Sequence, residues 1–168
     1  LLPDLLGYFL TGVKTTEMTI AGTSCLMENR QENWSIEVAR RFGIPEKLYT
    51  EIVEPRTFKG NLRQEIQIQT GMKNTRLVAT VGHDSAAAVA AIPDFGENKL
   101  YISIGTNVSM GVERSECLLS REGYLKGFKN TGGIDRKKII YRDFSACWHL
   151  NEFIRTRKEQ GITYSFVD

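Results

Sequence analysis

The residue of this chain best placed to do chemistry is Asp84, which lies between an apolar run and a stretch of small residues. The run Leu-Val-Ala-Thr-Val at 77–81 predicts a buried strand, central and parallel. The segment 86–91 predicts a helix that Pro93 stops. A carboxylate at such a helix N-terminus is favoured in its ionised form and can accept a proton from a substrate hydroxyl. The alternative is that Asp84 only caps the helix.

Two glycine-containing segments further along the chain could approach a phosphate group. Gly105-Thr106 falls in the turn of a predicted hairpin, where a bare backbone and a hydroxyl can contact phosphate oxygens. An ordinary hairpin turn explains the same pattern. Gly132-Gly133 is the other candidate, with a plain loop as its alternative. The sequence holds neither a Walker A motif nor a complete G-x-G-x-x-G pattern, which excludes those common nucleotide loops.

Histidine and cysteine are too sparse for several other kinds of site. His83 and His149 are the two histidines, so a multi-histidine site is excluded and no metal ligand is predicted. His83 either contacts a ligand beside Asp84 or packs with a hydrogen bond. The cysteines are odd in number and widely spaced, which indicates reduced thiols in a cytoplasmic protein. They are Cys25, Cys117 and Cys147.

Length and composition indicate a globular protein of one ordinary domain or parts of two. The 168 residues are 41% hydrophobic and 25% charged, and the net charge of +2 is too small to indicate nucleic acid or a membrane surface as a partner. No apolar run approaches the ~20 residues that cross a bilayer. The chain lacks an initiator Met and opens on Leu1-Leu2-Pro3, inside a predicted helix. We therefore expect a fragment of a longer protein.

Local patterns predict the elements that would position these residues. A short helix runs from Pro3 to Gly12, and the segment 15–24 indicates close packing or a loop. The segment 64–71 fits a helix or a strand, and the short helix is preferred. The remaining expectations are a helix from Ser35 to Gly43, a short helix at 46–49, a domain-boundary linker at 93–98, a hairpin of strands 100–104 and 108–112, a loose segment around 130–133, and a last helix at 142–158 with Phe144 and Trp148 in the core.

Four segments, in this order, resemble the middle of the FGGY family of carbohydrate kinases. They are Pro-Asp-Leu-Leu-Gly-Tyr-Phe-Leu-Thr-Gly at 3–12, Val-Gly-His-Asp-Ser-Ala-Ala-Ala-Val at 81–89, Tyr-Ile-Ser-Ile-Gly-Thr at 101–106 and Asn-Thr-Gly-Gly-Ile-Asp at 130–135. The His-Asp pair, followed by a small hydroxyl residue and an alanine-rich helix, is most similar to the rhamnulokinase branch of the family.

The resemblance implies an α/β protein with the actin-like, ribonuclease-H-like ATPase fold, in which ATP and a sugar meet between two domains. Residues 1–95 would be the C-terminal part of the N-terminal, sugar-binding domain, and 99–168 the start of the nucleotide-binding domain. Asp84 matches the family's catalytic base. The residues that match sugar contacts are His83, Asp84, Ser85 and Asp143, and those that match nucleotide contacts are Gly105, Thr106, Gly133 and Asn151.

The same resemblance implies ATP-dependent phosphorylation of a ketose such as L-rhamnulose, with Mg²⁺ as cofactor. Its expected partners are a small sugar and ATP, without nucleic acid or membrane, and it allows a homodimer. Asp143 and Asn151 stand where the branch typically has Asn and Gln, and Asn107 and Ser109 also depart from the pattern. The alternative function is therefore a non-catalytic relative that binds sugar or nucleotide. The family's phosphate-binding hairpin and adenosine-binding segment have no counterpart here, so we expect this part alone to be inactive.

Overall fold

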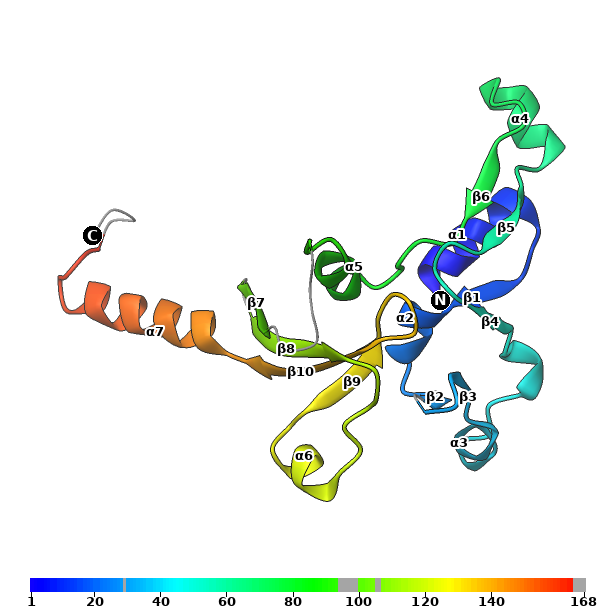
Figure 1. Ribbon diagram of the computed structural model, residues 1–168. Helices are drawn as coiled ribbons and strands as arrows, with labels where there is room; N and C mark the ends of the chain where they lie inside the picture. Colours follow the sequence, from blue (N-terminus) through cyan, green and yellow to red (C-terminus); the bar gives the residue numbers. More distant parts are fainter. Residues whose placement is uncertain (29, 94–99, 105–106, 165–168) are drawn as a thin grey trace.

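The structure, a computed structural model, describes residues 1–28, 30–93, 100–104 and 107–164, and for residues 146 and 147 it describes the backbone alone. Figure 1 shows a group of short helices and strands from the first half of the chain, which leads into a twisted sheet. The terminal helix α7 (Ala146–Glu159) projects away from the end of that sheet.

The first half of the chain consists of short helices and paired strands. β1 (Thr15–Glu17) pairs in parallel with β4 (Glu51–Val53), and β5 (Phe58–Asn61) pairs antiparallel with β6 (Arg76–Val78). The other elements are α1 (Leu2–Thr11), α2 (Met18–Gly22), the antiparallel pair β2 (Met27–Glu28) and β3 (Asn33–Trp34), α3 (Ile36–Arg41), the 3-10 helix η1 (Glu46–Leu48) and α4 (Gln64–Thr70).

The second half is built on one antiparallel sheet of four strands in the order β7-β8-β10-β9. A helix, α5 (Asp84–Ala90), precedes it and packs on it (Figure 1). The sheet elements are β7 (Leu100–Ile104), β8 (Val108–Arg114), β9 (Lys129–Gly132) and β10 (Lys138–Phe144), with α6 (Arg121–Leu125) between β8 and β9.

Most of the elements predicted from local sequence patterns are confirmed. α1 ends at Gly12, whose φ of 82° is left-handed and whose N–H donates to the Tyr8 carbonyl at 2.7 Å. α3 begins after Ser35, whose side chain accepts a hydrogen bond from the Val38 N–H. The helix at 64–70, the 3-10 turn at 46–48, the helix before Pro93 and the hairpin of β7 and β8 also form.

The prediction of a central parallel strand at 77–81 is wrong. β6 spans Arg76–Val78, pairs antiparallel with β5 in a sheet of two strands, and leaves the Val78 side chain 49% exposed. After β6 the chain continues without strand geometry, although the N–H of Ala79 still donates to the Thr57 carbonyl at 2.8 Å. An apolar run reports a tendency to be buried but does not say which strand pairs with it.

Two other expectations need correction, and a third concerns residues that the structure does not describe. The segment around 130–133 is not loose, because residues 129–132 form β9. The last helix begins at Ala146 rather than 142, since 142–144 still belong to β10, and Phe144 and Trp148 are 36% and 54% exposed instead of buried. Residues 94–98 of the expected linker lie outside the described residues.

Buried apolar side chains form two small clusters. Met18, Ala21 and Met27 form the first, which places the segment 15–24 in a packed environment. The second joins Ala86 and Val89 of α5 to Ile139 of β10. The second cluster matters most for a functional site, because it fixes α5 against the face of the sheet.

Candidate active site

The carboxylate of Asp84 lies at the surface, at the first position of α5. The residue before the helix is His83, which makes no side-chain capping bond, so Asp84 is not the N-cap that the alternative interpretation required. The Asp84 side chain is 97% exposed, and its Oδ1 accepts a hydrogen bond from the Ser85 N–H at 2.7 Å. The His83 Nε2 lies 3.6 Å from the same oxygen. A substrate hydroxyl can therefore reach this carboxylate.

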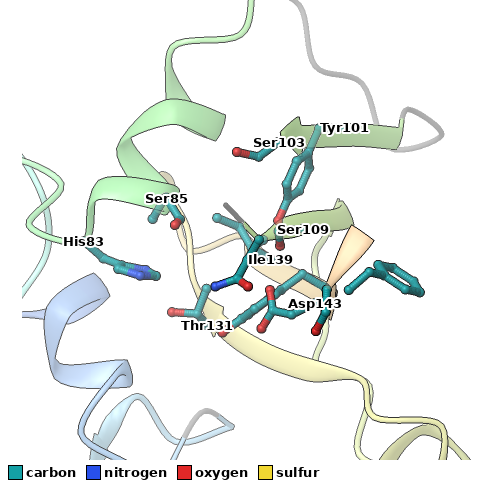
Figure 2. A pocket seen from close by; sticks show the side chains of 13 residues that line it. His83, Ser85, Tyr101, Ser103, Ser109, Thr131, Ile139 and Asp143 are labelled. Atoms are coloured by element: carbon teal, nitrogen blue, oxygen red, sulfur yellow. The ribbon is translucent and has the colours of Figure 1, made fainter. Parts of the chain in front are cut away.

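A cavity of about 440 Å³ opens between the start of α5 and the four-stranded sheet (Figure 2). Three of the predicted sugar contacts line it: His83 and Ser85 from the start of α5, and Asp143 from β10. Asp84 lies between His83 and Ser85 in the sequence but does not itself line the cavity. The polar side chains around the cavity are those of His83, Ser85, Tyr101, Ser103, Asn107, Ser109, Thr131, Tyr141, Asp143 and Ser145.

Two buried polar atoms at this cavity have no hydrogen-bond partner among the described residues. They are the Nδ1 of His83 and the Oγ1 of Thr131. A buried polar group without a partner costs about 1–3 kcal/mol, so such groups are commonly satisfied by water or a ligand. Figure 2 shows His83 at the start of α5 and Thr131 on the sheet. The polar side chains that line the cavity suit a ligand that carries several hydroxyl groups.

Sequence reasoning missed most of the sheet residues on this wall, although a signal was present. Except for Phe144 at the end of β10, the lining residues of β7, β8, β9 and β10 have odd numbers, as strand alternation requires for one face of a sheet. The register places Ser109 opposite both Ser103 and Asp143. The alternation in 101–103 and 139–143 could therefore have identified this face.

Gly111 makes room for the two tyrosines of this face. It lies opposite both Tyr101 and Tyr141 in the register. A Cβ added to Gly111 would lie 2.7 Å from the Tyr101 hydroxyl and 2.6 Å from the Ile140 carbonyl oxygen, too close for either atom. The missing side chain thus lets the Tyr101 ring lie across the sheet and bound the cavity.

Burial raises the pKa of both phenols on this face. It raises the pKa of Tyr101 to about 12, against a smaller lowering by a hydrogen bond with Ser109. Burial also raises the pKa of Tyr141. Both side chains are neutral at ordinary pH, so they can donate or accept hydrogen bonds but cannot serve as bases.

Asp143 is held by a lysine on the neighbouring strand. Its Oδ2 accepts a hydrogen bond from the Lys129 Nζ at 2.8 Å, and this bond raises the pKa of Lys129. Both side chains are about half exposed, 41% for Asp143 and 57% for Lys129. The cation compensates the charge that distinguishes Asp143 from the expected Asn, and one carboxylate oxygen stays available to a ligand.

The predicted nucleotide contacts are not brought into this cavity. Gly105 and Thr106 lie outside the described residues. Gly133 is buried in the turn before β10, and its N–H donates to the Lys137 carbonyl at 2.8 Å, so that amide is already engaged. Asn151 is exposed on α7 and does not line the cavity.

Neither a metal cluster nor a membrane span is found in the described part of the chain. No group of three or more His, Cys, Asp or Glu side chains converges there as a cation site. Among the described helices, none is both long and apolar enough to cross a bilayer.

The comparisons with known proteins define the class to which this fold and cavity belong. The model of the "FGGY family of carbohydrate kinases, N-terminal domain" matches residues 1–91, so the chain belongs to that family. A xyloylose kinase from Brucella ovis superposes with a TM-score of 0.80 at 19% identity, over 97% of this chain and 33% of that one. A Plasmodium falciparum glycerol kinase with ADP gives a TM-score of 0.76 at 17% identity, over 94% and 32%. The α/β fold is thus the actin-like ATPase fold of these sugar kinases.

The relatives in sequence are rhamnulokinases. That of Bacteroides thetaiotaomicron is 34% identical over 162 residues, which cover 96% of this chain and 33% of the relative. That of Enterococcus faecalis is 30% identical over 168 residues, which cover 100% and 33%. The chain therefore spans about a third of the length of the curated relatives it matches.

Proposed function

We propose that the full-length protein containing this chain transfers a phosphoryl group from ATP to a hydroxyl of a ketose such as L-rhamnulose. The similarity to two rhamnulokinases over almost the whole chain supports this substrate class. Residues 1–95 would complete the sugar-binding domain, and 99–168 would begin the nucleotide-binding domain. The family-model match over 1–91 supports the first of these assignments.

One observation carries the proposal: an exposed carboxylate begins α5 beside a cavity that is lined mostly by polar side chains. The sugar would occupy that cavity and contact His83, Ser85 and Asp143. Its reacting hydroxyl would face Asp84. The hydroxyl oxygen bonds to the γ-phosphorus of ATP while the bond from that phosphorus to the β–γ bridging oxygen breaks and ADP leaves. Because the pKa of an alcohol is far above 7, the hydroxyl proton leaves late and passes to the Asp84 carboxylate.

The nucleotide side of the reaction requires parts of the protein beyond the cavity. Gly105 and Thr106 are proposed to contact ATP phosphate, and Gly133 and Asn151 to contact the nucleotide. The described residues contain no cluster of carboxylates that could hold Mg²⁺. We therefore propose that Mg²⁺ binds together with ATP, and we assign it no ligand among these residues. Phosphoryl transfer depends mainly on position and charge neutralisation, which two closing domains can supply. A cytoplasmic location and a homodimer are compatible with this proposal.

The test compares two carboxylate variants in the full-length protein. Asp84→Asn keeps the shape of the side chain but removes its basicity, so turnover of ATP with L-rhamnulose should fall by about 10²–10⁴-fold. Glu37→Gln is the matched control, because Glu37 is also an exposed carboxylate in the first turn of a helix and is remote from the cavity lining. ADP release gives the rate and calorimetry gives ATP binding, which should stay within about twofold. Near-normal turnover in Asp84→Asn would refute the role of the carboxylate.

A second candidate is a relative that binds sugar or nucleotide without turnover. The carboxylate of Asp143 in place of the expected Asn is the observation that favours it. The same calorimetry on the wild-type protein separates the two functions. Binding of L-rhamnulose or ATP without ADP release would favour the second.

A further inference from the structure

Two buried residues far from Asp84 in sequence hold the turn that precedes it. Glu17, at the end of β1, and Thr19, in α2, are 3% and 0% exposed. The Thr19 Oγ1 accepts hydrogen bonds from the N–H groups of Gly82 at 3.1 Å and His83 at 3.2 Å. The Glu17 Oε2 also accepts from the Gly82 N–H, at 2.9 Å. The N–H groups of the two residues directly before Asp84 thus both donate hydrogen bonds to Glu17 or Thr19.

The pair is itself locked in place by further bonds. The Glu17 carboxylate accepts from the Thr19 hydroxyl at 2.6 Å, from the Thr19 N–H at 2.9 Å and from the Ile20 N–H at 3.2 Å. Since the single hydroxyl proton of Thr19 goes to Glu17, the oxygen's lone pairs are left to accept from the turn. A buried network of this kind rigidifies the groups it connects.

Glycine at position 82 allows the turn to lie close to Glu17 and Ile20. A Cβ at this position would lie 2.9 Å from the Glu17 Oε2 and 3.3 Å from the Ile20 Cβ. The missing side chain allows the turn to approach the carboxylate. On its other side, α5 is packed through Ala86 and Val89 against Ile139. The carboxylate at the start of α5 is therefore placed from both sides.

We propose that Glu17 and Thr19 are positioning residues for Asp84, and this inference rests on the function proposed above. Neither residue lines the cavity itself, and both act by fixing the backbone of the turn at 82–83. A displacement of about 1 Å can cost roughly 10²-fold in rate when a reacting group must meet its partner at a set distance. The loss should appear in kcat, while ATP binding is retained.

The experiment uses three threonine variants of the full-length protein, with ATP and L-rhamnulose as substrates. Thr19→Ala removes the hydroxyl that holds the turn, and Thr19→Ser keeps it. The matched control is Thr16→Ala, because Thr16 is also a buried threonine, and its hydroxyl bonds to Thr50 at 2.6 Å rather than to the turn. We expect kcat to fall about 10–100-fold in Thr19→Ala and by less than about threefold in the other two. The KM for ATP should be unchanged in all three.

Equal kcat values in Thr19→Ala and Thr16→Ala would overturn the inference, as would a failure of Thr19→Ser to restore turnover. If Thr19→Ala does not fold, Glu17→Gln decides, since it keeps the size of the side chain but replaces one acceptor oxygen by a donor. A loss of kcat with ATP binding kept supports the inference, and an unchanged kcat overturns it. Asp84→Asn is measured in parallel: normal turnover there refutes the proposed function, whereas loss only there refutes the positioning role alone.

Discussion

The buried ion pair between Asp4 and Lys59 gives the sharpest prediction about stability. The Lys59 Nζ lies 3.0 Å from the Asp4 Oδ1, and both side chains are 6% exposed. The same oxygen accepts a hydrogen bond from the Glu17 N–H at 3.0 Å, and the Asp4 Oδ2 has no partner among the described residues. The pair joins α1 to β5, and through Glu17 it reaches β1.

Removal of one partner leaves a buried charge without compensation. In Lys59→Met the Asp4 carboxylate would keep a single N–H donor, and the loss of one member of a buried pair costs about 3–5 kcal/mol. For a domain of ordinary size this corresponds to a fall of roughly 6–20 °C in the unfolding temperature. Replacement of both partners, Asp4→Leu with Lys59→Met, should recover only part of that loss: an apolar pair of similar volume is about neutral, but the buried Glu17 N–H loses its acceptor at a cost of about 1–3 kcal/mol.

Calorimetry and urea unfolding of the full-length protein measure these differences. Lys126→Met is the control, because Lys126 pairs with Glu122 at 2.6 Å with both side chains exposed, and such a pair contributes less than about 1 kcal/mol. A double-mutant cycle isolates the coupling between Asp4 and Lys59. If Lys59→Met melts within a degree or two of Lys126→Met, the assignment of a desolvated pair is refuted.

Two further predictions concern the face of the sheet that bounds the cavity. Gly111→Ala should lose about 1–3 kcal/mol by overpacking and weaken sugar binding, because Tyr101 must move; Gly132→Ala is the control, since its Cβ would meet Met18 at an ordinary 3.4 Å. Equal urea midpoints in the two variants would contradict this reasoning. Burial also raises the pKa of Tyr101 to about 12, whereas tyrosine in the unfolded state ionises near 10. The free energy of unfolding should therefore fall as the pH rises from about 10 to 12, because only the unfolded state ionises this phenol there. Absorbance near ~295 nm should therefore show one phenol fewer titrating near pH ~12 in Tyr101→Phe, and an unchanged titration would contradict the raised pKa.

Local signals explain which elements could be predicted from the sequence. Ser35 and Gly12 mark helix ends through bonds and a backbone conformation that depend on a few neighbouring residues. The hairpin of β7 and β8 likewise follows from alternation and a short turn. By contrast, the partner of β6 and the strand character of 129–132 depend on residues distant in sequence. No nearby pattern specifies such pairings.

Some residues of the candidate site could likewise be predicted from contiguous sequence, and others could not. The position of Asp84 at the start of a helix could be predicted because the strand-like run, the polar turn and the alanines are contiguous. Glu17 and Thr19 could not, since they meet the turn across 63–65 residues of chain. The expectation that Phe144 is a core residue failed because a helical period was applied to a segment that is the end of β10.

The turn before Asp84 and the helix after it contact two different parts of the chain. α5 is bonded on one side to α2 through Thr19 and packed on the other against β10 through Ile139. The first contact belongs to the part matched by the N-terminal family model, and the second lies beyond that match. The turn and the helix that carry Asp84 thus contact both parts of the chain. Because hydrogen bonds to the backbone depend strongly on distance and angle whereas apolar packing tolerates small sliding, the turn should stay with α2 when the two parts shift. The polar cavity, whose other wall is the sheet, would then change width while the Asp84 backbone stays in register with Glu17 and Thr19.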